Sequence, residues 1–127
     1  GLIVPAINNE PGLYSARYAG LNATDADNRN KLISKLKDKR LESTYAYFFC
    51  CIVAVGIKGQ NEIIVCDGKV EGEIRTIERG EKGFGYDPMF YPKGYSESFA
   101  ELNSLEKNKI SHRGQALKKL MDKLNKT

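Results

Sequence analysis

Two apolar runs separated by a short polar segment constrain the fold of this 127-residue chain more than any other feature. The first, Tyr45–Val55, consists almost entirely of aromatic residues, β-branched residues and cysteine, which is typical of a strand in a protein core. The second, Ile63–Ile74, predicts another strand, and the polar segment KGQNE between them predicts a turn. We therefore expect the two runs to pair as a hairpin.

A further turn is expected inside the second run, at Asp67 and Gly68. The Asp-Gly dipeptide is frequent in tight hairpin turns because both positions tolerate positive φ. It would be followed by a third, more exposed strand that carries Val70, Gly72 and Ile74.

Helical spacing of apolar residues occurs in two segments. Ala26–Leu41 predicts a helix that is capped by Asp25 or Asp27. Residues 111–125 predict a terminal helix with Ser111 as its N-cap. The expected buried stripes are Leu32, Ile33, Leu36 and Leu41 in the first helix, and Leu117, Leu120, Met121 and Leu124 in the second.

Three shorter segments complete the expected elements. Leu2–Ile7 predicts a short buried strand that Pro5 interrupts, and Pro88–Tyr95 predicts another extended piece. Ser98–Ile110 predicts a loop followed by a short helix. Strands and helices are mixed around one sheet, with no repeat or linker. We therefore expect an α/β fold with a mixed central sheet flanked by helices, in a single domain over residues 1–127.

The composition argues against several classes of protein. No apolar run approaches the roughly 20 residues that span a bilayer, so we expect no membrane association. The formal net charge of +4 fits a protein that handles an anionic small molecule. We expect no stable nucleic-acid partner, because a duplex-binding module usually carries a denser basic patch. Cys50, Cys51 and Cys66 lack metal-ligand spacing and are interpreted as buried small hydrophobes in a reducing compartment, the cytoplasm.

The segment GFGYDP (Gly83–Pro88) admits two interpretations. It fits a glycine-rich turn after a strand, with Phe84 and Tyr86 partly buried. It also fits a binding loop, because glycines let the backbone approach a ligand closely and an aromatic ring can stack on a flat base. In that case the Asp87 carboxylate would accept hydrogen bonds from ring N–H groups.

The segment EKNKISHRG (Glu106–Gly114) contains the single histidine of the chain. His112 and Arg113 follow Ser111, so they fit an ordinary helix start. Together with Lys107, they also form a set of donors suited to phosphate or carbonyl oxygens. Combined with the aromatic loop, this set describes a nucleotide site.

Three motifs in the same chain, PGLYSARYAG, GFGYDPMFYP and EKNKISHRGQAL, resemble the inosine/xanthosine triphosphate pyrophosphatase family. The similarity runs from Gly1 to about Leu124. It implies a mixed α/β fold with a long central sheet, a homodimer and a requirement for Mg²⁺. The implied reaction hydrolyses noncanonical purine nucleoside triphosphates, those of inosine, deoxyinosine or xanthosine, to the monophosphate and pyrophosphate.

The resemblance also implies roles for individual residues. The family's base-binding segment falls on Phe84, Gly85, Tyr86 and Asp87, and its substrate lysine falls on Lys107. Its His-Arg pair falls on His112 and Arg113. The YSARYAG segment (residues 14–20) is assigned to the sheet edge and the dimer region rather than to chemistry.

The same roles imply how a base would be selected. A 6-keto purine presents O6 as an acceptor and N1–H as a donor. Arg113 or His112 would donate to O6, and Asp87 would accept from N1–H. Adenine reverses both polarities and would leave buried groups unpaired, which can reject an analogue by orders of magnitude.

The chain departs from the family pattern at its beginning. An Asp-Asp-Ser-Gly-Leu segment that supplies a metal-binding aspartate and general base is absent, and Gly1-Leu2 stands where that segment ends. We therefore expect the chain to be the C-terminal two-thirds of such a domain, and inactive in hydrolysis by itself. Two rival interpretations are a non-catalytic nucleotide- or RNA-binding domain and a purely structural domain.

Overall fold

A computed structural model describes residues 1–56 and 62–125 of the chain. The strands are β1 (Leu2–Val4), β2 (Glu10–Pro11), β3 (Ser43–Val55), β4 (Ile63–Arg75) and β5 (Phe90–Pro92). The α-helices are α1 (Asp25–Asp38), α2 (Ser104–Ile110) and α3 (His112–Leu124), and the short 3-10 helices are η1 (Pro5–Ile7), η2 (Gly12–Arg17) and η3 (Asp87–Met89). The strands form one antiparallel sheet in the order β2-β1-β3-β4-β5. The predicted mixed α/β fold is confirmed.

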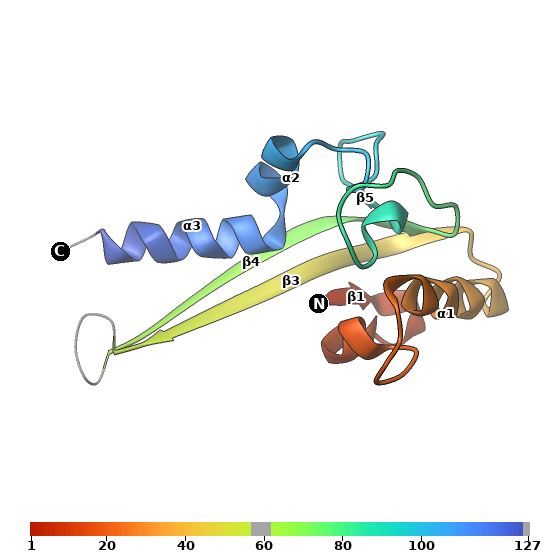
Figure 1. Ribbon diagram of the computed structural model, residues 1–127, viewed down its shortest axis with the longest axis horizontal. Helices are drawn as coiled ribbons and strands as arrows, with labels where there is room; N and C mark the ends of the chain where they lie inside the picture. The colour runs from red at the N-terminus through yellow and green to blue at the C-terminus, as the bar shows by residue number, and fades with distance from the viewer. Residues whose placement is uncertain (57–61, 126–127) are drawn as a thin grey trace.

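The long β3–β4 hairpin dominates the shape of the molecule (Figure 1). Its ladder runs without interruption from the pair Ser43–Arg75 to the pair Val55–Ile63. The predicted hairpin is therefore confirmed. The turn predicted for KGQNE falls mostly on residues 57–61, which lie outside the described residues.

The turn predicted at Asp67 and Gly68 is wrong, because both residues lie inside β4, opposite Cys51 and Cys50. A Cβ atom on Gly68 would lie 1.9 Å from the carbonyl oxygen of His112. The glycine therefore serves close packing of a helix against the strand rather than a turn. The exposed third strand is wrong for the same reason, because Val70, Gly72 and Ile74 lie on the buried face of β4.

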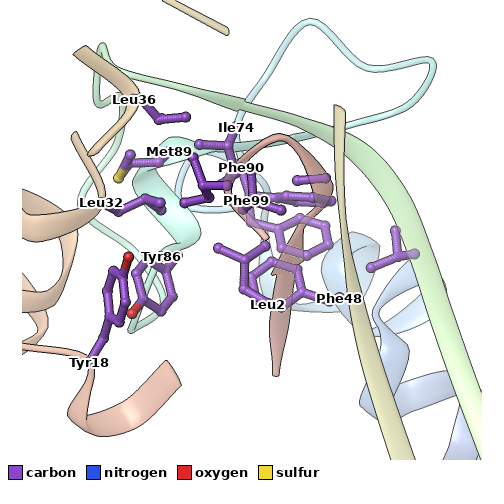
Figure 2. Close-up of a cluster of buried hydrophobic side chains, with 14 of the residues drawn as sticks. Leu2, Tyr18, Leu32, Leu36, Phe48, Ile74, Tyr86, Met89, Phe90 and Phe99 are labelled. Atoms are coloured by element: carbon purple, nitrogen blue, oxygen red, sulfur yellow. The ribbon is translucent and has the colours of Figure 1, made fainter. Parts of the chain in front are cut away.

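We call the half of the hairpin nearer the pair Ser43–Arg75 its inner half. The main core lies where this inner half meets β1, β5 and α1 (Figure 2). Phe48 contacts Phe90 edge-on at a centroid distance of 4.7 Å, and Phe99 packs 5.9 Å from Phe48. Aromatic rings supply much buried area, and both edge-on and offset stacked contacts are favourable. Leu32 and Leu36 of α1 are fully buried, as predicted from their spacing.

The predicted helix starts are partly confirmed. Thr24, rather than Asp25 or Asp27, is the N-cap of α1, and Asp27 completes its capping box. The side chain of Ser111 caps α3, as predicted, by accepting a hydrogen bond from the N–H of Gly114. Pro5 ends β1 and begins η1, which agrees with the interrupted strand that was expected.

The buried stripe predicted for α3 is wrong. Leu117 and Met121 are about half exposed, at 53% and 51%, whereas Ala116 is fully buried. The helix approaches β4 so closely at Gly68 that only small groups fit between the two elements. In the described part of the chain, no helix has the length and apolar character needed to cross a membrane.

Candidate functional site

A cavity of about 510 Å³ opens between η2, the start of α1, the 83–87 loop and the junction of α2 with α3. Its size falls in the range of small-molecule sites. All seven predicted site residues line this cavity, namely Phe84, Gly85, Tyr86, Asp87, Lys107, His112 and Arg113. Two segments that are far apart in the sequence therefore line one cavity.

The 83–87 loop owes its shape to two glycines in the left-handed region. Gly83 has φ +77° and Gly85 has φ +62°, values that L side chains rarely adopt. A Cβ atom on Gly83 would lie 2.2 Å from Asp87 Oδ2. That carboxylate oxygen accepts a hydrogen bond of 3.0 Å from the N–H of Phe84. The glycine thus lets the carboxylate reach back and close the loop.

The two aromatic side chains of the loop differ in their surroundings. Phe84 is 54% exposed, whereas Tyr86 is buried and donates a 2.8 Å hydrogen bond to the Ser15 carbonyl. Burial raises the pKa of the Tyr86 hydroxyl, so this group stays protonated and keeps donating. The structure therefore leaves Phe84 as the ring with a broad accessible face, and Tyr86 as the anchor of the loop.

Lys107 and Asp87 form a largely buried ion pair. Their Nζ and Oδ2 atoms lie 2.6 Å apart, and the side chains are 19% and 7% exposed. The same ammonium lies 4.8 Å from the centroid of the Phe84 ring. Lys107 thus lies against the 83–87 loop, and its contact with phosphate stays a prediction.

His112 and Arg113 begin α3 at the edge of the cavity. The His112 ring stacks on Phe48 at 4.8 Å with an interplanar angle of 9°. Burial, followed by the positive charges of the chain N-terminus, Arg113 and Lys107, lowers the pKa of His112 to about 4. The imidazole is therefore neutral at pH 7. The guanidinium of Arg113 lies 4.8 Å from the Phe84 centroid, on the exposed side of the site.

The Nδ1 atom of His112 is buried and has no hydrogen-bond partner among the described residues. Buried polar atoms are normally paired, so an orphan on a cavity wall indicates a place for a ligand or a water molecule. A neutral imidazole has one donor and one acceptor nitrogen. His112 can therefore either donate to or accept from a bound base.

The sequence did not predict all of the residues on the cavity wall. Ser15 and Ala16 line the cavity, although their segment was assigned to the sheet edge and the dimer region. Asp25 also lines it, and its Oδ2 accepts a 2.9 Å hydrogen bond from the N–H of Gly85. The sequence could have indicated Ser15 through its place in the YSARYAG motif. Nothing in the sequence relates Asp25 to a loop 60 residues away.

The donor set was tested for a fit to Mg²⁺, which prefers oxygen ligands in octahedral geometry. Within residues 1–56 and 62–125, no group of three or more His, Cys, Asp or Glu side chains is placed to hold a metal ion. Asp87 is paired with Lys107, and Asp25 is bonded to Gly85. These residues do not form a magnesium site, so no chemical step is derived through the metal.

Residues 1–123 match the sequence profile of the Ham1 family. The chain belongs to the Ham1 family. A relative from Idiomarina loihiensis, named dITP/XTP pyrophosphatase, is 48% identical over 126 residues, which are 99% of this chain and 62% of the relative. A relative of the same name from Clostridium perfringens is 49% identical over 98% of this chain and 60% of its own length.

Solved structures of Ham1 proteins have the same fold. The HAM1 protein from Coxiella burnetii superimposes with a TM-score of 0.91 at 42% identity, covering 100% of this chain and 64% of that one. The Ham1 protein from Staphylococcus aureus gives a TM-score of 0.88 at 44% identity, over 98% of this chain and 62% of that one. The chain thus spans about 60% of the length of the relatives that it matches.

Proposed function

We propose that the cavity binds the base of a deaminated purine nucleoside triphosphate, and that the chain serves the hydrolysis of such nucleotides. In this reaction water cleaves the bond between the α- and β-phosphates and yields the monophosphate and pyrophosphate. The observation that carries the proposal is the half-exposed Phe84 ring, with Lys107 and Arg113 each 4.8 Å from its centroid, in one cavity with Asp87. The names of the Ham1 relatives support the same substrate class.

The polar groups around Phe84 suit a 6-keto purine. Arg113 carries donors only, and can give one to O6. The carboxylate of Asp87 is an acceptor, and its Oδ2 already receives hydrogen bonds from Lys107 and from the N–H of Phe84. Its second oxygen would accept from N1–H. The neutral His112 adds one donor or acceptor, as its tautomer requires.

Adenine would meet this arrangement with the wrong polarity. Its 6-amino group would face the donors of Arg113, and its N1 acceptor would face the Asp87 carboxylate. Sites built to pair with a substrate N–H or carbonyl group can reject the mismatched analogue by about 10⁴ or more. Base selection therefore follows from the charge types on the cavity wall.

Mg²⁺ belongs to this proposal as the divalent cofactor of the reaction. Such an ion would neutralise phosphate charge and would lower the pKa of an attacking water. The described residues do not form its site, so binding of the nucleotide base is the property of this chain that can be tested directly.

Isothermal titration calorimetry with inosine triphosphate and adenosine triphosphate tests the proposal. The purified chain should bind inosine triphosphate at least about tenfold more tightly, since each lost charged hydrogen bond costs about 1.5–3 kcal/mol. A single-stranded RNA oligonucleotide tests the rival RNA-binding function. Tighter binding of the RNA, or equal affinity for the two triphosphates, would contradict the proposal.

We also propose that the chain forms a homodimer through the outer face of the hairpin. The apolar side chains exposed on this face are Tyr45, Phe49, Val53, Val55, Ile63 and Val65. Soluble monomers rarely expose a contiguous apolar patch this rich in large side chains, so such patches mark interaction sites. A second copy of the chain would cover this patch with its own copy of the patch, in a two-fold symmetric contact.

Sedimentation equilibrium tests the dimer. A lysine in place of Val53 should give a monomer, because it would bury an unpaired charge. Ser43→Lys adds the same charge at an exposed position of β3 outside the apolar patch, and should leave the mass unchanged. A monomeric wild-type chain, or a dimer that tolerates Val53→Lys, would exclude this interface.

We propose the cytoplasm as the compartment of this protein. The three cysteines, Cys50, Cys51 and Cys66, are free thiols, which supports a reducing environment. The expectation that all three are buried is wrong, because Cys51 lies exposed on the outer face of β3. Its side chain points away from the covered face because strand residues alternate in direction.

A further inference from the structure

One face of α1 holds the 83–87 loop at a single residue, Gly85. Asp25 and Arg29 are four residues apart, so their side chains lie on the same side of the helix. Asp25 Oδ2 accepts a 2.9 Å hydrogen bond from the N–H of Gly85. Arg29 Nη1 donates a 2.8 Å hydrogen bond to the carbonyl of Gly85. The N–H and the carbonyl of one residue are therefore both bonded to one helix.

The guanidinium of Arg29 is itself fixed from a second side. Its Nε donates to the carboxylate of Glu78, in the segment that follows β4. The side chain of Arg29 is only 19% exposed, so these hydrogen bonds are partly shielded from water. Arg29 does not belong to the residues that line the cavity. It bridges two chain segments behind the loop and would not touch a ligand.

Gly85 is the residue of the loop whose conformation depends most on hydrogen bonds from outside the loop. It has φ +62°, no side chain, and nothing within 4 Å of the position that a Cβ atom would occupy. Glycine has the largest conformational freedom of all residues, and this freedom must be removed if the neighbouring ring is to stay in place. The neighbouring ring is Phe84, the half-exposed aromatic face of the site.

The other contacts of the loop act at other residues. The ion pair with Lys107 ties Asp87, two residues after Gly85, to α2. The hydrogen bond from the N–H of Phe84 to Asp87 is internal to the loop, so it fixes the shape of the loop but not its place. Tyr86 anchors the following residue to the carbonyl of Ser15. Phe84 precedes Gly85 in the chain and Tyr86 follows it, so the orientation of the two peptide units that flank Gly85 affects where the Phe84 ring lies.

We propose that Asp25 and Arg29 are positioning residues that clamp Gly85 and thereby hold the Phe84 ring in place for base stacking. The role in stacking rests on the proposed function, whereas the clamp itself does not. Arg29 should contribute more than Asp25, because its hydrogen bond to Gly85 is partly buried and the one made by Asp25 is exposed.

Binding of inosine monophosphate, measured by calorimetry, is the first readout. Arg29→Met keeps the apolar stem but removes the donors, and should weaken binding about 5- to 20-fold. Lys31→Met is the matched control, since Lys31 also lies on α1 and donates to a backbone carbonyl, that of Tyr18, away from the loop. It should leave the affinity within about twofold of wild type.

A second pair of variants separates the hydrogen bond of Asp25 from its charge. Asp25→Ala should weaken binding about two- to fivefold, and Asp25→Asn should weaken it less, because an amide oxygen still accepts from Gly85. Asp27→Ala removes an equal charge from the same helical turn, and also a capping contact to Thr24, but does not touch the loop. It should lower the melting temperature without weakening binding.

Amide hydrogen exchange at Gly85, followed by NMR without ligand, is the second readout. In Arg29→Met and in Asp25→Ala, exchange at Gly85 should be about tenfold faster than in wild type, while the amides of the β3–β4 ladder stay protected. If wild type does not bind inosine monophosphate, the proposed function fails and the exchange data alone judge the clamp. If Arg29→Met binds as well as Lys31→Met does, or if Gly85 exchange is unchanged, the clamp is overturned.

Discussion

The two faces of the β3–β4 hairpin share one strand pattern but differ in what covers them. On the covered face, Phe48 is buried against Phe90, Phe99 and His112. On the outer face, Val53 and Val65 are 58% and 51% exposed. Both faces belong to the same continuous ladder, so backbone pairing does not account for the difference.

The comparison shows that alternation decides which face a strand residue points to, and the neighbouring layer decides whether that face is buried. Even-numbered residues of β4 are buried along its whole length, because α3 and the side chains of the core lie over them. Odd-numbered residues have no such layer in the described part of the chain. The site lies at the inner half, where rigid packing can hold its residues.

Replacement of adjacent phenylalanines on β3 should reveal this difference most strongly. Phe48→Ala should lower the free energy of unfolding by about 3–5 kcal/mol, because it leaves a cavity among three rings. Phe49→Ala removes the same atoms from the opposite, 37% exposed face and should cost about 1 kcal/mol or less. Urea unfolding of the two variants measures both values, and equal losses would contradict the two-sided account of the hairpin.

Phe84→Leu should weaken ligand binding at the site without destabilising the core of the inner half. The change keeps an apolar side chain but removes the aromatic face, so affinity for inosine monophosphate should fall by about 1–3 kcal/mol. The melting temperature should hardly change, because the ring is 54% exposed. Calorimetry and thermal unfolding give the two numbers. A large fall in melting temperature with unchanged affinity would show that Phe84 is a core residue.

Mildly acidic pH should first destabilise the packing around His112, at the inner half of the hairpin. The pKa of His112, about 4 in the folded chain, lies below its ordinary value of 6.5, so the unfolded chain binds more protons between these values. Stability is therefore fully present above pH 6.5 and falls as the pH drops toward 4. The carboxyls of Glu10 and Glu71, whose pKa values are lowered by hydrogen bonds from tyrosine and lysine side chains, affect stability only below their ordinary pKa of 4.5.

Thermal unfolding between pH 7 and pH 5 measures this effect. The melting temperature should fall over this range in wild type, and fall less in His112→Phe, which keeps a ring against Phe48 but cannot titrate. Equal slopes in the two proteins would exclude His112 as the source. The expected shift is the smallest of these effects, because the imidazole is only partly buried.

Local chemistry was predictable from the sequence, and contacts between distant segments were not. The Ser111 cap, the interruption at Pro5 and the hairpin follow from rules that act over a few residues. Gly68 was misread as a turn because the group that requires a glycine there, the carbonyl of His112, lies more than 40 residues away in the sequence. The clamp of Asp25 on Gly85 was missed for the same reason.

The wrong stripe of α3 has a related cause. Leu117, Leu120, Met121 and Leu124 recur at helical spacing, which predicts an apolar face but not the surface that covers it. The strand beneath α3 presents Gly68, so the buried residue at the crossing is Ala116, and Leu117 faces the cavity instead. Of the site, the sequence supplied the residues of the two motifs, and the structure supplied their contacts.

The central claim is that charge types on the cavity wall select a 6-keto purine, and Arg113 is the donor that tests it most directly. Calorimetry should compare inosine monophosphate with adenosine monophosphate, in wild type and in Arg113→Ala. Wild type should prefer inosine monophosphate at least about tenfold. Arg113→Ala should lose roughly 10- to 150-fold in affinity for inosine monophosphate and little for adenosine monophosphate. Equal losses for both nucleotides, or no preference in wild type, would contradict base selection by this cavity.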